Sequence, residues 1–289
     1  MESGTRSKGF IRDCNIPHRG VGEASRRRRG CVSFFNPSFF RLFKGFRDVL
    51  GFFTIIPVRF GDFEGAADHA YWLPALGALI AGIASVFAAL SFYLLPPSLT
   101  GIIVLLVSLL ITGFNNIDGL ADFADGMMAH GDLERKRSAM KDTGIGISGL
   151  VSCIFVIGIA ASVLMEISIL GFSPLIKAIF VSEIGAKYAM LLISYVGRPA
   201  FEGLGSAFLE RVKGPQIVIG SIIAIILLLP AGPVALTALI VIPTVFTIMV
   251  LADRNFGGIS GDVIGASGEL SRTAILLGVI ALFYNLQRV

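Results

Sequence analysis

The sequence has few charged residues for its length. Only 15% of its 289 residues are Asp, Glu, Lys or Arg, 54% are hydrophobic, and the mean hydropathy is +0.80. An ordinary soluble domain carries about 25% charged residues. The shortage of charge therefore excludes an ordinary soluble globular protein and favours a chain that folds in a lipid bilayer.

Cysteine and histidine are also scarce. The three cysteines, Cys14, Cys31 and Cys153, are too widely separated for a disulfide framework or a zinc-binding spacing. The three histidines are scattered, so we assign none of them to a metal. The first 30 residues contain many Arg and Gly but no hydrophobic core of a signal peptide.

Long apolar runs are abundant, and they do not alternate with the period of two that a membrane β-barrel requires. A transmembrane helix needs about 20 mainly apolar residues. The sequence predicts about seven spans, near 72–95, 99–117, 147–170, 174–195, 215–230, 233–251 and 271–286. The predicted fold class is all-α, a polytopic membrane helical bundle.

Positive charge is concentrated at the N-terminus, where residues 1–60 hold 12 Lys/Arg against 4 Asp/Glu. Beside a membrane domain this favours contact with anionic lipid and not with nucleic acid. We predict that residues 1–32 are a basic, disordered extension and that residues 33–289 form one integral-membrane domain. Aromatic and basic residues alternate over 33–60, which predicts an N-terminal interfacial helix.

The connections between the predicted spans differ in charge. The connections PPSL, GFSP and PAGP have none, whereas those over 118–146, 196–214 and 252–270 contain Lys and Arg. The positive-inside rule then places the polar connections in the cytoplasm. We expect a multi-pass protein of the cell membrane whose functional loops face the cytoplasm.

The stretch NNIDGLADFADG places Asp118, Asp122 and Asp125 at i, i+4 and i+7, on one face of a helix. Adjacent carboxylates repel one another unless cations neutralise them, and oxygen ligands of this kind suit Mg²⁺. We expect Gly119 and Gly126 to leave room for a polar ligand. Two alternatives stay open: ion pairs with basic residues of other helices, and a proton- or sodium-coupled transport pathway.

The following stretch, ERKRSAMKDTGIGISG, predicts a short charged helix over 134–141 and then a glycine-rich turn. Backbone N–H groups in such a turn can bind phosphate oxygens. Lys141 and Arg135 are candidates to neutralise further negative charge. The candidate residues in this stretch are Arg135, Lys141, Asp142, Gly144 and Gly146.

Polar residues elsewhere in the chain complete the candidate site. Asp262 and Glu269 lie in the late glycine-rich patch DRNFGGISGDVIGASGELSR, and Glu64 precedes the first span. The spacing of Glu183 and Lys187, i and i+4 in an apolar helix, predicts a buried ion pair between them.

These motifs resemble a known family. The runs GFNNIDGLADFADG and RKRSAMKDTGIGISG, together with the later FGGISGDVIGASGEL, are similar to the signature of the cobalamin-5'-phosphate synthases (adenosylcobinamide-GDP ribazoletransferases). The similarity spans roughly 46–286. The sequence departs from the family where some members have Ser-Arg and this chain has Ser182-Glu183.

The resemblance implies a reaction and its partners. A ribose hydroxyl of α-ribazole, or of its 5'-phosphate, attacks the phosphate attached to adenosylcobinamide in adenosylcobinamide-GDP, and GMP leaves. Mg²⁺ is the implied cofactor and the lipid bilayer the implied surroundings. Because attack on a diphosphate needs charge neutralisation, we predict metal ligands and catalytic residues within one polar chamber. The predicted metal ligands are Asp118, Asp122 and Asp125, the catalytic residues Asp122, Asp142 and Lys141, and the substrate-binding residues Glu64, Arg135, Gly144, Gly146, Asp262 and Glu269.

Two other classes of protein compete with this interpretation. One is another Mg²⁺-dependent membrane phosphotransferase or prenyltransferase, although D-x3-D-x2-D lacks the upstream element of the CDP-alcohol enzymes. The second is an ion-coupled transporter, which would have polar openings on both faces of the membrane. The predicted crowding of polar loops on one face argues against transport.

Overall fold

The computed structural model describes residues 37–58 and 61–286. The extension predicted over 1–32 lies outside them. Within the described residues the sole β-structure is an isolated bridge between Pro199 and Ile259, which confirms the all-α fold class. The helices are α1 (Pro37–Phe53), α2 (Phe63–Asp68), η1 (Ala70–Trp72), α3 (Leu73–Leu94), α4 (Pro97–Ile111), α5 (Asn115–Met128), α6 (Leu133–Met140), α7 (Ile147–Ile169), α8 (Phe172–Val196), α9 (Leu204–Arg211), α10 (Gly214–Leu228), η2 (Leu229–Ile240), α11 (Val241–Phe256) and α12 (Gly261–Leu286).

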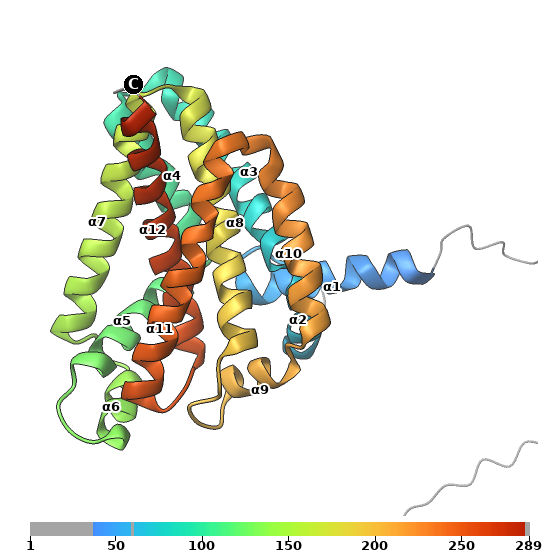
Figure 1. Ribbon diagram of the computed structural model, residues 1–289, viewed down its shortest axis with the longest axis vertical. Coiled ribbons are helices and arrows are strands. Elements are labelled where there is room, and N and C mark those ends of the chain that lie inside the picture. The colour runs from blue at the N-terminus through green and yellow to red at the C-terminus, as the bar shows by residue number, and fades with distance from the viewer. Residues whose placement is uncertain (1–36, 59–60, 287–289) are drawn as a thin grey trace, which may run out of the picture. The chain divides into compact units, whose positions relative to one another are not determined.

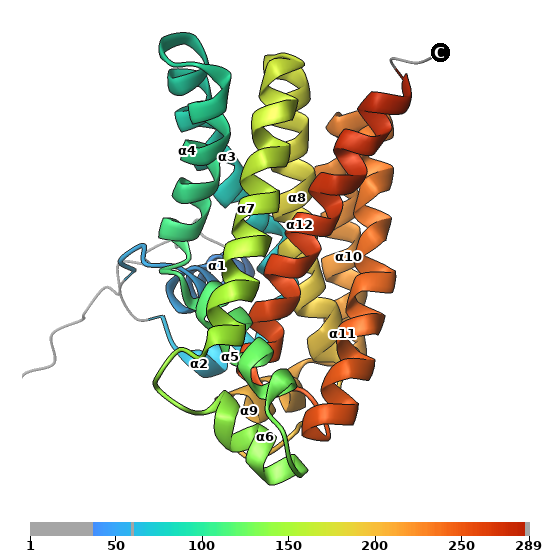
Figure 2. The ribbon, with the colours of Figure 1, turned by 90° about the vertical axis from the view of Figure 1, so that its left-hand side faces the viewer.

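The long helices run roughly side by side, and the short helices α2, α5, α6 and α9 gather toward one end of them (Figure 1). The turns after α3, α7 and α10 lie at the opposite end, together with the end of α12 (Figure 2). α8 is the central helix, because it packs against α3, α7, α10, α11 and α12 and most of its residues are buried. The arrangement separates polar connections from apolar turns, as the charge pattern predicts.

Four helical stretches of the described residues are long and apolar enough to cross a membrane: Ala70–Leu94, Ile147–Ile169, Gly214–Phe256 and Gly261–Asn285. A fifth is present if the bent pair α4 and α5 is counted as one span. The stretch Gly214–Phe256 reverses direction near Gly232, so that α10 and α11 run antiparallel (Figure 1). The structure thus has the expected polytopic helical architecture, with four or five candidate spans by length and composition where the sequence predicts about seven.

The span predicted over 99–117 is not one continuous helix. α4 ends at Ile111, and α5 leaves it at an angle of 89°. Gly113 and Phe114 form the bend with φ values of 63° and 61°, a left-handed conformation that is costly for a residue with a side chain. The bend separates the acidic stretch from the apolar run and turns α5 toward α12, against which it packs.

The start of the last span is also predicted wrongly, since α12 begins at Gly261, ten residues before 271. The preceding α11 continues to Phe256. The glycine and serine residues of this region have weak helix propensity, but they let helices approach closely inside a membrane protein. By contrast, the short charged helix predicted over 134–141 is confirmed as α6.

The interfacial helix predicted over 33–60 corresponds to α1. This helix lies across the direction of the long helices (Figure 1), and its hydrophobic residues Phe46 and Val49 face the bundle. Its depth in a bilayer stays a prediction.

Candidate active site

Two glycines bring α5 and α12 into close contact. A Cβ atom added to Gly119 would lie 2.7 Å from the Asp262 carbonyl oxygen, and one added to Gly265 would lie 3.2 Å from the Asn116 Cα. Gly119 is therefore a contact point between helices and not the space for a ligand that the sequence suggested. The close approach places Asp118 of α5 beside Asp262 of α12.

Gly126 has a similar packing role at the other end of α5. A Cβ atom there would lie 2.8 Å from Phe256 and 3.0 Å from the Met140 Cβ. The space expected beside Gly126 is thus filled by α6 and α11.

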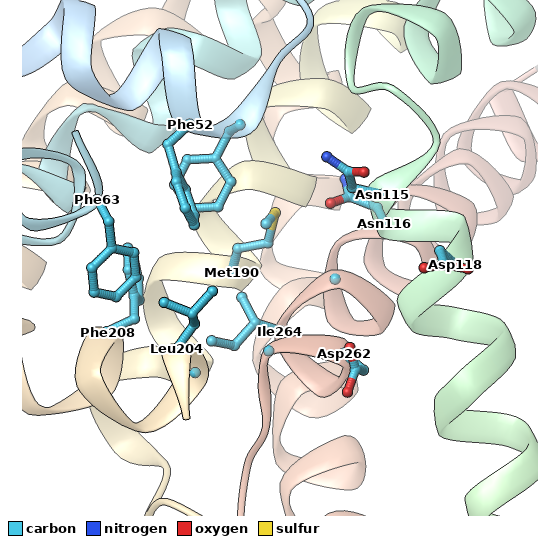
Figure 3. Close-up of a pocket in the computed structure, with 14 residues that line it drawn as sticks. Phe52, Phe63, Asn115, Asn116, Asp118, Met190, Leu204, Phe208, Asp262 and Ile264 are labelled. Carbon is cyan, nitrogen blue, oxygen red and sulfur yellow. The ribbon is translucent and has the colours of Figure 1, made fainter. Parts of the chain in front are cut away.

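A cavity of about 400 Å³ opens where α5 and α12 meet. Figure 3 shows Asp118, Asp262 and two asparagines on one side of it and aromatic side chains on the other. The polar side consists of Asn115, Asn116, Asp118 and Asp262, and the apolar side of Phe52, Phe53, Phe63, Met190, Leu204, Phe208 and Ile264. The structure therefore joins one predicted metal ligand with one predicted substrate-binding residue in a single concave site.

Asp122 lies one turn beyond Asp118 on α5 and is half-buried. It interacts electrostatically with three carboxylates: Asp262 most strongly, then Asp118 and Asp125. Asp262 also interacts with Asp118 and with the cation of Lys141. The concentrated negative charge suits a cation or a cation-bound phosphate.

No group of three or more Asp, Glu, His or Cys side chains is arranged to hold a metal in residues 37–58 and 61–286. Mg²⁺ commonly takes one or two protein carboxylates and completes its shell with water and substrate phosphates. Asp118 and Asp262, which line one cavity, fit such a substrate-completed site. The metal role of Asp118, Asp122 and Asp125 stays a prediction.

Asp125 has a structural role that the sequence analysis missed. Its Oδ2 accepts a hydrogen bond from the Gly146 N–H at 2.7 Å, and its Oδ1 accepts one from the Gly149 N–H at 2.8 Å. These N–H groups belong to the start of α7, so the carboxylate caps that helix from a distant part of the chain.

The predicted phosphate cradle is not open in this structure. The Gly146 N–H donates to Asp125, and the Gly144 N–H donates to Asp142 Oδ1 at 3.2 Å. Both groups already have carboxylate acceptors, so the structure corrects the expectation that they are free to bind phosphate.

A second cavity, of about 510 Å³, lies beside α6. Lys141 and Asp142 line it together with Arg137, and the Lys141 Nζ lies 3.8 Å from the ring centroid of Phe201. The predicted residue Arg135 does not line this cavity. Arg137, which was not predicted, holds α6 to the end of α11 through a hydrogen bond from its Nε to the Phe256 carbonyl at 2.8 Å.

Glu64 lies on α2 and does not line the α5–α12 cavity, although its neighbour Phe63 does. Its carboxylate is 3.3 Å from Arg211 of α9, which also bonds Asp68 at 3.0 Å. The hydrogen bond with Asp68 raises the pKa of the Arg211 guanidinium above its ordinary value. Glu64 therefore helps to join α2 to α9.

Glu269 was predicted to bind substrate, but it is deeply buried and does not line the α5–α12 cavity. Its carboxylate pairs with Arg272, which also binds Glu183 through its Nε at 2.9 Å. The predicted pair between Glu183 and Lys187 is not formed; the Lys187 Nζ lies 3.6 Å from the Met190 sulfur. Glu183 of α8 thus pairs with Arg272 of α12 and not with Lys187 of its own helix. The Arg272 guanidinium can bind the carboxylates of Glu183 and Glu269 at once.

Comparison with known proteins identifies the family. The family model described as cobalamin-5-phosphate synthase matches residues 45–280. The chain belongs to this family. It is 37% identical over 236 residues to the adenosylcobinamide-GDP ribazoletransferase of Thermococcus gammatolerans, covering 81% of this chain and 96% of the relative.

Two further relatives are also adenosylcobinamide-GDP ribazoletransferases. That of Pyrococcus abyssi is 35% identical, with 80% of this chain and 95% of the relative covered. That of Methanococcoides burtonii is 35% identical, with 80% and 89% covered. No solved structure matches the chain. The matched region, residues 45–280, contains every predicted site residue of this chain.

The aromatic and amide residues of the cavity are not among the residues predicted from the sequence. Phe52, Phe63 and Phe208 come from α1, α2 and α9, so no local spacing relates them. Asn115 and Asn116 lie just before Asp118, at the end of an apolar run. Two adjacent amides at such a position could have indicated a polar site.

Proposed function

We propose that this chain is an adenosylcobinamide-GDP ribazoletransferase that joins α-ribazole, or its 5'-phosphate, to adenosylcobinamide-GDP and releases GMP. The observation that carries the proposal is the pairing of Asp118 and Asp262, from α5 and α12, on one wall of the cavity. Family membership separates this activity from the prenyltransferase and transporter alternatives.

The proposed reaction exchanges one bond to phosphorus for another. The ribose hydroxyl oxygen bonds to the phosphorus that carries cobinamide, and the bond from this phosphorus to the bridging oxygen breaks, so that this oxygen leaves with GMP. Asp122 is the proposed acceptor of the hydroxyl proton, because it lies next to Asp118 and Asp262 and is partly shielded from solvent.

Mg²⁺ is the proposed cofactor, with Asp118 and Asp262 as ligands and Asp122 next to them. When bound, the ion would neutralise the diphosphate and stabilise the leaving phosphate. Lys141 supports this arrangement, because its cation interacts with Asp262 while its side chain lines the neighbouring cavity. We assign the second cavity, which Lys141 and Arg137 line, to the guanosine diphosphate part of the corrinoid substrate.

We also propose a location in the cell membrane, with α2, α5, α6 and α9 on the cytoplasmic side. The support is that Arg and Lys residues of α6 and α9 lie at the end of the bundle that carries the polar connections. In a chain whose own three cysteines are replaced by serine, a cysteine placed at exposed Thr143 is expected to react with a membrane-impermeant maleimide only after the cells are opened. Labelling of intact cells would reverse the orientation.

The experiment that tests the function uses the purified full chain in liposomes with Mg²⁺. We expect GMP to be released when adenosylcobinamide-GDP is present together with α-ribazole or its 5'-phosphate, and not when either partner is left out. Chromatography with mass detection would show the joined corrinoid. Absence of both products, with protein that retains its helical circular-dichroism spectrum, would overturn the proposal.

A further inference from the structure

One side of the α5–α12 cavity is built from aromatic rings. Phe52 and Phe63 meet with their ring centroids 5.4 Å apart, and Phe63 and Phe208 with theirs 6.4 Å apart. These residues come from α1, α2 and α9 and line the same cavity. Together, Phe52, Phe63 and Phe208 form an aromatic wall.

The members of the aromatic wall differ in burial. Phe208 is only 3% exposed and holds α9 against the bundle, whereas Phe52 is 38% exposed although it has aromatic neighbours. Figure 3 shows the wall across the cavity from the asparagines and the two aspartates. A large, partly open ring that lines a cavity offers a surface on which a flat ligand can stack.

The opposite side contains a buried amide. Asn116 is 6% exposed and lines the cavity, and its Nδ2 makes no hydrogen bond of standard geometry within the described residues. The nearby carboxylate of Glu269 interacts with this side chain. The buried amide therefore belongs to the polar side of the cavity, opposite the aromatic wall.

The size of the cavity limits the ligand. A volume of about 400 Å³ lies at the lower end of the roughly 300–1,000 Å³ that small-molecule sites occupy. It has room for a nucleoside but not for a corrin macrocycle with its nucleotide. The smaller substrate of the proposed reaction therefore fits inside, and the larger one approaches from the open side.

We propose that the aromatic wall binds the planar base of the nucleoside substrate by stacking, with Phe52 as the principal contact. The base then lies at the apolar end of the cavity, and the ribose points toward Asn116, Asp118 and Asp262. The proposal rests on the proposed function for the identity of the nucleoside. The proposal orients the nucleoside in the cavity, with its base at the aromatic wall and its attacking hydroxyl at the aspartates.

The kinetic test replaces Phe52 by leucine, which keeps an apolar side chain but removes the stacking face. Because stacking on an aromatic ring contributes to the binding of a base, we expect the KM for α-ribazole to rise about tenfold. The KM for adenosylcobinamide-GDP should stay within about twofold. Phe52→Tyr, which keeps the ring, should restore the KM for α-ribazole.

The matched control is Phe246→Leu on α11, where the ring is 61% exposed and outside the cavity. It should leave both KM values unchanged. If Phe52→Leu lowers the yield of folded protein, Phe63→Leu is the second variant for the same measurement. An unchanged KM for α-ribazole in a folded variant, or an equal rise for both substrates, would overturn the proposal.

A binding measurement separates this proposal from the proposed function. Isothermal titration of the full chain in nanodiscs with α-ribazole alone needs no turnover. Weaker binding by Phe52→Leu than by wild type supports the base site even where no GMP is released, in which case the function fails alone. If the wild type releases GMP but both proteins bind α-ribazole equally well, the proposed base site is overturned and the proposed function stands.

Discussion

Replacing Asp118 or Asp262 by asparagine is expected to lower kcat for GMP release by about 100- to 1,000-fold, the loss seen when one preorganised electrostatic group is removed from an active site. Both carboxylates line the same cavity wall, and both changes keep the size of the side chain while removing its charge. The measurement is steady-state GMP release by purified protein in liposomes.

Divalent cations should control the same reaction. We expect chelation with EDTA to stop GMP release by the wild-type protein and added Mg²⁺ to restore it. In Asp118→Asn and Asp262→Asn the Mg²⁺ concentration for half-maximal activity should rise, because Mg²⁺ prefers charged oxygen ligands. Full activity after chelation would rule out the proposed cofactor.

Two other variants make the result specific. Glu210→Gln removes an exposed carboxylate of α9 that does not line the cavity, and it should retain wild-type turnover. Asp125→Asn removes the charge that accepts two N–H groups of α7, so it should lower the unfolding temperature, whereas Asp118→Asn should not. Turnover by folded Asp118→Asn and Asp262→Asn at the wild-type rate would contradict the assigned chemistry.

The sequence predicts much of the helical scaffold because apolar runs and caps are local signals. The long spans near 72–95, 147–170 and 174–195 correspond to α3, α7 and α8 within about three residues. The bend at Gly113 and Phe114 escapes such reasoning, because the end of the apolar run at Phe114 does not show whether the helix continues. Only the left-handed backbone conformation of these two residues reveals the bend. The early start of α12 escapes for another reason, because packing against α5 and α8 stabilises a glycine-rich helix that propensity disfavours.

The acidic stripe shows how far residue spacing can assign roles. The three aspartates lie on one helix, α5, as predicted. They have different contacts and different roles in the structure. Asp118 lines the cavity, Asp122 lies one turn further along α5 and interacts with Asp118 and Asp262, and Asp125 caps α7. Spacing along one helix cannot distinguish these roles, because each depends on a partner elsewhere in the chain, such as Asp262, 144 positions after Asp118.

Replacing Arg272 by methionine is expected to destabilise the protein by about 3–5 kcal/mol, the usual cost of removing one partner from a buried ion pair. Arg272 is 1% exposed, and its guanidinium joins Glu183 of α8 to Glu269 of α12. Without it, two buried carboxylates lose their shared cation, and Lys187 is the remaining cation that interacts electrostatically with Glu269.

Thermal unfolding in detergent, followed by circular dichroism, measures the stability lost in Arg272→Met. Arg254→Met is the matched control, because Arg254 is exposed near the end of α11 and its loss should change stability by no more than about 0.5 kcal/mol.

An apolar replacement of all four buried charges, at Glu183, Lys187, Glu269 and Arg272, should regain most of the stability, since such replacements are often neutral or stabilising. If Arg272→Met unfolds at the wild-type temperature, the guanidinium does not hold α8 to α12. If the fourfold variant is as unstable as Arg272→Met, the loss comes from packing and not from unpaired charge.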